Sequence, residues 1–115
     1  MSANNKTYHP LNYITIEADE DLLPNRFVDF NGGVCASESK SLGVTDSKWL
    51  SGEQASIITI GIAVVESSVA IDAGDLLTSD TDGKAKKATG IMQVNGRSLD
   101  TITGAGFVRV ILIHS

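Results

Sequence analysis

Short apolar runs, interrupted every few residues by glycine, aspartate or serine, dominate the pattern of the chain. The longest run covers residues 57–65 (IITIGIAVV) and is apolar apart from Thr59 and Gly61. Branched side chains pack well on a pleated surface, so this run predicts a buried strand, entered from residues 54–60. The run is too short to cross a membrane as a helix, which needs about 20 apolar residues.

The stretch after this run predicts a compact meander. Gly74 precedes Asp75, and Gly83 follows Asp82. Glycine adopts a positive φ at little cost and aspartate bonds its own backbone, so both places predict turns. The segments on either side of these turns then become short antiparallel strands, at residues 69–71, 76–78 and 84–87.

Three other segments extend the β pattern. Residues 12–18 (NYITIEA) alternate in polarity and predict a half-buried strand. Residues 26–30 and 34–36 flank Asn31-Gly32, a dipeptide typical of a type I′ hairpin. Residues 107–113 (FVRVILI) are apolar on both faces, which predicts a strand that is central in the sheet or covered by a neighbouring subunit.

Two segments are less regular. Residues 91–94 predict a strand before Asn95-Gly96, a second hairpin-type dipeptide. Residues 45–50 predict a single helical turn capped by Thr45 or Asp46. The segment contains Trp49, the single tryptophan of the chain, which we expect to anchor either the core or a subunit interface.

The predicted fold class is all-β: a small β-barrel or sandwich-like domain of short antiparallel strands with an extended N-terminal arm. A length of 115 residues fits one domain, and aromatic residues make up only 5%, so the core must consist of aliphatic side chains. We assign residues 12–115 to the domain. We assign residues 1–11 to a flexible N-terminal arm, because residues 1–10 are polar and lack periodicity and Pro10 favours extended backbone before it. This arm either frays or becomes ordered on a partner.

Charge and cysteine content narrow the function. The net charge of −5 disfavours nucleic-acid binding, because phosphate contacts need clustered lysine and arginine. The basic residues of 84–87 lie beside acidic turn residues and are expected to be solvated. Cys35, the single cysteine, lies in an apolar context and is interpreted as a buried hydrophobe. No signal peptide is evident, which predicts synthesis and use in a cytoplasm, and no membrane partner is expected.

No arrangement of residues typical of an enzyme is present. Nucleophile-elbow, zinc-protease, P-loop and paired-cysteine motifs are missing from the sequence. His9 and His114 lie near the two ends, where a general base is difficult to hold rigidly. The aspartates of residues 72–82 each occupy a position that suits a turn. We therefore predict no catalysis, no cofactor and no metal site.

The order of several short motifs resembles the capsid cement (head decoration) proteins of tailed phages. The resemblance covers residues 26–113, and each motif alone is common in β domains. The motifs, in chain order, are Arg26-Phe27-Val28, Leu42-Gly43-Val44, Gly52-Glu53, Gly61-x-Ala63, Val65-Glu66, Ala73-Gly74-Asp75-Leu76-Leu77, Ser79-Asp80-x-Asp82-Gly83-Lys84-Ala85, Gly96-Arg97-Ser98-Leu99, Gly104-Ala105-Gly106 and Val108-Arg109-Val110.

The resemblance implies a structural role. It implies a domain that binds the outside of an expanded icosahedral head as trimers at three-fold sites, with the major capsid protein and sister subunits as partners. On this hypothesis, two groups of residues are expected to make contacts. Capsid contact is expected of Tyr8, His9, Pro10 and Leu11, and subunit contact of Trp49, Phe107, Arg109 and Ile111. The alternative is a small β-barrel module that binds a ligand or glycan without catalysis.

Overall fold

The computed structural model describes residues 7–114, which form eight strands and no helix. The all-β prediction is therefore confirmed. The strands are β1 (His9–Glu17), β2 (Phe27–Val28), β3 (Gly43–Thr45), β4 (Gln54–Ser67), β5 (Leu76–Ser79), β6 (Ala85–Lys87), β7 (Gly96–Ser98) and β8 (Gly106–Leu112).

Five strands close a barrel in the order β4-β6-β5-β7-β8, because β8 pairs back onto β4. The closing pair is antiparallel and runs in regular register from Ile62 opposite Ile111 to Ser67 opposite Gly106. The contact between β4 and β6 is a single parallel pair, Ser67 with Ala85. Closure removes the open edges that a sheet of such short strands would otherwise expose.

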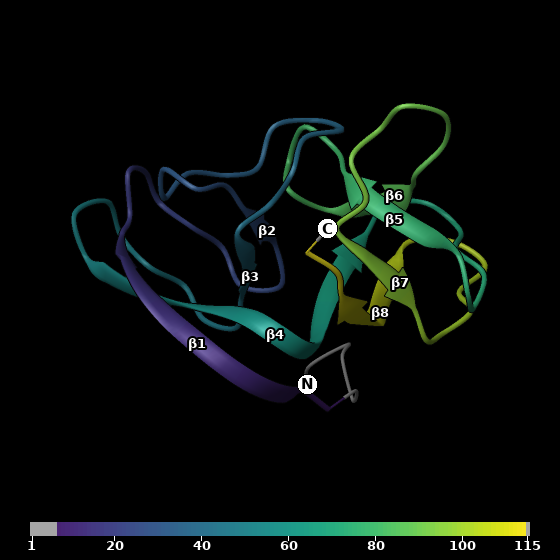
Figure 1. Ribbon diagram of the computed structural model, residues 1–115, viewed down its shortest axis with the longest axis horizontal. Helices are drawn as coiled ribbons and strands as arrows, with labels where there is room; N and C mark the ends of the chain where they lie inside the picture. The colour runs from purple at the N-terminus through teal and green to yellow at the C-terminus, as the bar shows by residue number, and fades with distance from the viewer. Residues whose placement is uncertain (1–6, 115) are drawn as a thin grey trace.

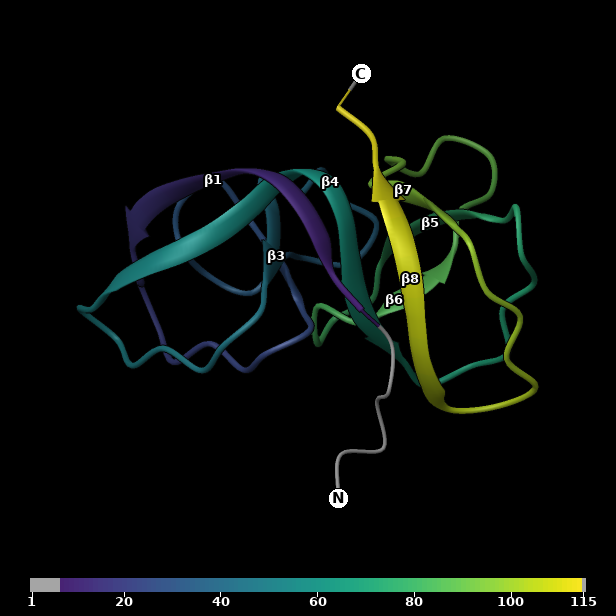
Figure 2. The same ribbon diagram turned by 90° about the horizontal axis from the view of Figure 1, so that it is seen from below.

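Strand β4 joins this barrel to a second lobe (Figure 1). Its first half pairs with β1 and with β3, and its second half pairs with β8 and β6. Ile62 pairs with both His9 and Ile111, so β1 and β8 lie on opposite edges of β4. We call residues 9–58 the wing and residues 59–114 the barrel lobe. Figure 2 shows β1 following β4 along the wing, away from β8.

Neighbouring residues of β4 are buried on both faces of the sheet. Ile58 belongs to the larger core, which fills the barrel and continues beneath β2 and β3. Ile57 belongs to a smaller core inside the wing, together with Leu22 and Val28. Both cores are largely aliphatic, as the scarcity of aromatic residues predicts. The long apolar run is therefore explained by a strand that is covered on both sides.

Of the two hairpin predictions based on Asn-Gly dipeptides, the first is right about the antiparallel return at Val34 but wrong about the turn type, and the second is wrong. Gly32 has φ 88°, but Asn31 is not among the positive-φ residues, so the turn is not type I′, and the return at Val34 is a single bridge to Val28. Gly96 lies inside β7 instead of in a turn. The preceding Asn95 is buried, and its side chain accepts from the Ser41 amide at 2.9 Å and donates to Ser39 O at 3.0 Å.

Three other expectations also need correction. Residues 91–94 are not a strand, and residues 69–71 contribute only an isolated bridge between Ile71 and Ile102. Residues 45–50 form no helical turn, because Thr45 ends β3 and Trp49 forms an isolated bridge with Leu22. At Trp49, a bridge to a residue distant in the sequence replaces the local structure that the sequence pattern favours.

Gly61 is predicted to be irreplaceable where β1 meets β4. It has φ 113°, and a Cβ there would lie 2.5 Å from His9 O and 2.7 Å from Leu11 N. We expect Gly61→Ala to lower the free energy of unfolding by about 3 kcal/mol, measured by urea denaturation. Gly52→Ala is the matched control, since Gly52 has φ 89° and open space around it, and it should cost about 1 kcal/mol. Equal losses would contradict close packing of β1 at Gly61.

Candidate docking surface

Strand β1 is an edge strand that remains open on one side. Among the described residues it pairs only with β4, and β4 is paired with β3 on its other edge. Seven of the nine residues of β1 are exposed, so the strand is not half-buried as the alternation predicted. Of its apolar side chains, Ile16 packs partly buried against the smaller core, whereas Ile14 is 40% and Leu11 80% exposed.

The two halves of this edge differ. Register shifts lie between Pro10 and Asn12 and again between Asn12 and Tyr13, where the Asn12 amide donates to Thr59 Oγ1 at 2.8 Å. From Tyr13 to Glu17 the register is regular. Proline, bulges and charged side chains are the usual devices that protect an exposed edge. The second half of β1 lacks such a device until Glu17.

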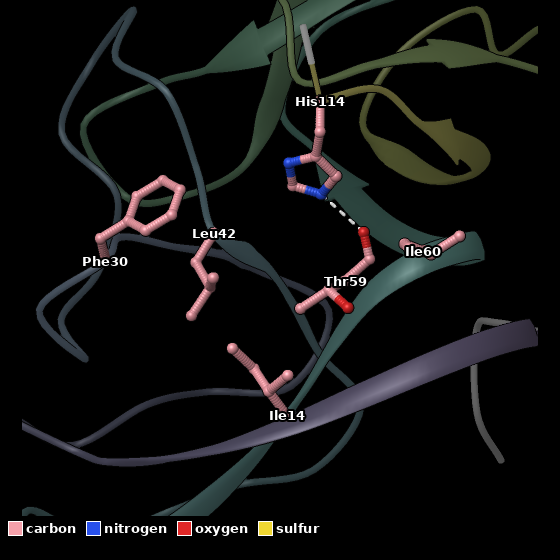
Figure 3. Close-up of a pocket in the computed structure, with 6 residues that line it drawn as sticks. All are labelled: Ile14, Phe30, Leu42, Thr59, Ile60 and His114. Carbon is pink, nitrogen blue, oxygen red and sulfur yellow. Dashed lines mark hydrogen bonds between the residues drawn. The ribbon is translucent and has the colours of Figure 1, made fainter.

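An apolar hollow of about 300 Å³ opens beside β1, on the face that carries Ile14 (Figure 3). It is open to solvent, and two of the large apolar side chains that line it are more than half exposed: Phe30 is 58% and Ile60 51% exposed. The lining residues come from β1, from β4, from the segment between β2 and β3, and from the C-terminal segment: Ile14, Phe30, Leu42, Thr59, Ile60 and His114.

The C-terminal segment is held against β4 and closes one side of the hollow. His114 Nε2 lies 2.6 Å from Thr59 O. Lys40 Nζ donates to Val94 O at 2.8 Å and also to Ile113 O. Partial burial lowers the pKa of Lys40. One lysine of the wing thus fixes two segments of the barrel lobe, and the position of His114 depends on it.

Negative charge is concentrated on the wing. Residues 9–58 carry eight acidic and three basic side chains, whereas residues 59–114 carry six and five. In the barrel lobe most charges are paired; Arg109, for example, lies 2.8 Å from Asp100, and Lys87 lies 3.5 Å from Asp72. At the far end of β1, Glu17 and Asp19 form no ion pair with another described residue. The open edge therefore ends in unneutralised negative charge.

The predicted capsid-contact residues separate into two kinds. Tyr8 packs against the barrel core, and its hydroxyl donates to Val64 O at 3.1 Å and accepts from the Asn25 amide. Burial, with a contribution from the Asp46 carboxylate, raises the pKa of Tyr8 above its ordinary value. By contrast, His9 and Leu11 are exposed within β1, and Pro10 is partly buried. These three residues of the predicted arm thus belong to a strand, and residues 1–6 lie outside the described residues.

The predicted subunit contacts lie in two places. Phe107, Arg109 and Ile111 alternate on β8 with the buried Val108 and Val110, so they share its outer face. Since β8 is hydrogen-bonded to both β4 and β7, it is central in the sheet, one of the two alternatives that the sequence left open.

Trp49 lies elsewhere, in the wing, where it packs partly buried against the smaller core. Its indole Nε1 is buried and has no hydrogen-bond partner among the described residues.

The hollow itself was not predicted. Its residues come from four separate segments, namely β1, the segment between β2 and β3, β4 and the C-terminal segment, so neither spacing nor local pattern brings them together. One signal was present: Phe30 is a rare aromatic residue beside a polar turn, where a buried side chain is not expected. An exposed aromatic side chain next to other apolar groups often marks an interaction site.

The described residues hold no group of three or more histidine, cysteine, aspartate or glutamate side chains that could bind a metal ion. Within the same residues, no helix is long and apolar enough to cross a membrane. Cys35 is fully buried, and its thiol contacts main-chain oxygens at 3.5 Å.

Fold and surface together define the class of the chain: a small closed β-barrel with a wing whose open edge and apolar hollow are suited to contact with another macromolecule. The fold is similar to a crystal structure described as the head fiber gp8.5 N base in bacteriophage phi29. The TM-score is 0.74 at 18% identity, and the match covers 89% of this chain and 93% of the other. No curated protein matches the chain.

The family model of phage cement proteins matches residues 8–112. The chain therefore belongs to the phage cement protein family. It is a structural protein associated with the capsid of the phage head, and this confirms the resemblance seen in the sequence.

Cys35 should be chemically inert in the folded protein. Burial raises the pKa of its thiol to about 11, so at pH 8 only about one molecule in a thousand carries the reactive thiolate. We expect iodoacetamide to label Cys35 only after urea unfolding. The neutral thiol stabilises the fold fully below pH 9, and this contribution is lost as the pH rises from 9 to 11. Rapid labelling of native protein at pH 8 would contradict this burial.

Trp49→Ala should destabilise the subunit, because the side chain packs on Leu22 and its neighbours in the smaller core. We expect a loss of about 2–3 kcal/mol in the free energy of unfolding, measured by urea denaturation. Sedimentation velocity on the same sample tests the predicted interface role. Unchanged assembly would assign Trp49 to the core, whereas loss of assembly at a temperature where the variant is folded would assign it to a subunit contact.

Proposed function

We propose that this protein decorates the exterior of an expanded phage head and stabilises it, acting as trimers at three-fold sites and without catalysis. Family membership supports an association with the capsid. The observation that favours a docking role is the open apolar edge of β1 beside the exposed hollow. A soluble monomer rarely leaves such an edge and such a hollow uncovered together. On this proposal the protein is made in the host cytoplasm and functions on the virion.

The stabilising mechanism is thermodynamic linkage. A protein that binds the expanded lattice and not the unexpanded or dissociated shell stabilises that lattice at every occupied site. With free protein at one hundred times the dissociation constant, the gain is about 2.7 kcal/mol per site. Because a head offers many equivalent sites, a modest gain at each one raises the disruption temperature of the whole shell.

A trimer would match the symmetry of such sites, since three copies around a three-fold axis make identical contacts with the lattice. We assign sister-subunit contact to the outer face of β8, formed by Phe107, Arg109 and Ile111. We assign capsid contact to His9, Pro10 and Leu11 at the start of β1. Tyr8 has a supporting role, because its hydrogen bond to Val64 O fixes the position of that segment on the barrel.

The alternative, a ligand- or glycan-binding module, gains little from the hollow. Glycan sites depend on aromatic platforms, and the lining contains Phe30 but neither tyrosine nor tryptophan. Its volume of about 300 Å³ is at the lower limit for small-molecule sites. The hollow is therefore better suited to one apolar side chain of a macromolecular partner.

The test is binding of the purified protein to undecorated heads of its own phage, expanded and unexpanded. We expect saturable binding to expanded heads only, in multiples of three per site, and an increase of several degrees in their disruption temperature. Light scattering during heating and quantitative gel densitometry give the two measurements. Absence of binding to either form of head would overturn the proposal.

A further inference from the structure

The regular half of the β1 edge offers unpaired main-chain groups to a partner. Tyr13 to Glu17 are in register with β4 on one side and form no strand pair with a described residue on the other; the edge closes after Glu17, where the main chain of Gly32 lies against Glu17 O and accepts from the Asp19 amide. In a strand, alternate residues direct their N–H and C=O groups to each side, so this edge presents a row of free donors and acceptors. An extended peptide could add there as a new strand.

The face and the charge of this edge restrict what can be added. A new strand next to β1 would bring every second side chain over Ile14, next to the hollow, within reach of a long apolar side chain. The same edge ends at Glu17 and Asp19, which form no ion pair with another described residue. A complementary segment is therefore extended, apolar on one face and basic at one end.

A second copy of this chain fits the edge poorly. Pairing of two identical edges in antiparallel register creates a two-fold axis, which is not an element of a closed trimer. It would also bring together two wings that each carry eight acidic and three basic side chains. The proposed trimer surface on β8 lies on the other edge of β4, so it does not overlap the β1 edge.

We propose that β1 captures an extended, basic and apolar segment of the capsid protein by strand addition along residues 13–17, with an apolar side chain of that segment seated in the hollow lined by Ile14, Phe30 and Ile60. This inference rests on the proposed function, because it names the partner surface and the mode of docking on the head. The strand supplies affinity through main-chain hydrogen bonds, and the hollow and the acidic end supply specificity.

The first experiment measures hydrogen–deuterium exchange of the wild-type protein, free and bound to expanded undecorated heads. We expect the fast-exchanging amides of residues 13–17, which face away from β4, to slow at least tenfold on binding. The turn at residues 88–92, where Ile91 is fully exposed, serves as the internal control and should not change. Unchanged exchange along residues 13–17 in bound protein would overturn strand addition.

The second experiment uses matched substitutions at two exposed apolar positions. Ile14→Lys places a charge at the rim of the hollow, whereas Val69→Lys places it at a similarly exposed site in the barrel lobe. We expect Ile14→Lys to weaken binding to heads at least tenfold and Val69→Lys to bind like wild type. Circular dichroism establishes that both variants are folded, and the exchange experiment provides a test that does not depend on either variant.

The third experiment tests the charge. Glu17→Lys combined with Asp19→Lys reverses the acidic end, and Asp72→Lys is the control in the barrel lobe, where the exposed Asp72 only pairs with Lys87. We expect the affinity of the double variant for heads to fall at least tenfold and to become independent of salt concentration. The control should keep the wild-type affinity, which decreases as salt is added. Equal effects of the two changes would contradict a basic segment at this end.

The outcomes separate the two proposals. If wild-type protein does not bind heads, the proposed function fails. If it binds, yet Ile14→Lys binds equally well and residues 13–17 stay unprotected, only strand addition fails. If Ile14→Lys instead dissolves the trimer in sedimentation velocity, the β1 edge is a contact between copies, and the capsid segment is excluded as its occupant.

Discussion

The shared strand β4 is the constraint on which the rest of the structure depends. The first half of its 14 residues pairs with strands of the wing and the second half with strands of the barrel, so displacement of β4 would disrupt the sheet of both lobes. Ile57 and Ile58 face different cores, which ties the two lobes together by apolar burial as well as by hydrogen bonds. Gly61 marks the changeover, where β1 approaches so closely that a side chain has no room.

Closure of the barrel and openness of the wing have complementary consequences. In the barrel lobe each strand is paired with two neighbours and most charges have partners, so no strand edge is left open there among the described residues. The wing keeps an unpaired edge, exposed apolar side chains and an excess of negative charge. On the proposed function this division separates two roles, because the barrel supplies stability and the wing supplies the contact with the capsid.

Most of the fold could be predicted from local patterns, and the errors share one cause. The apolar run at 57–65, the turns at Gly74 and Gly83 and the strand at 107–113 were all identified, because each depends on the properties of consecutive residues. The Asn-Gly dipeptides were weaker signals: the chain does turn back at Asn31-Gly32, but not through a type I′ turn, and Asn95-Gly96 forms no hairpin turn. Asn95 is used to bond the main chain of Ser39 and Ser41 from a distant loop, and Gly96 is needed where Val110 packs closely on β7. These are demands of tertiary packing that a local pattern cannot express.

The sequence by itself determined the all-β class, the aliphatic core, the burial of Cys35 and, through an ordered series of short motifs, the family. Each of these depends on composition or on neighbouring residues. Only the tertiary structure decided that β1 is an exposed edge, that Tyr8 is anchored on the barrel and that Ile14, Phe30 and His114 surround one hollow. The physical reason is that edges and hollows arise from the pairing of strands that are distant in the sequence. The alternation of polar and apolar residues along one strand is the same whether or not a neighbouring strand pairs with it.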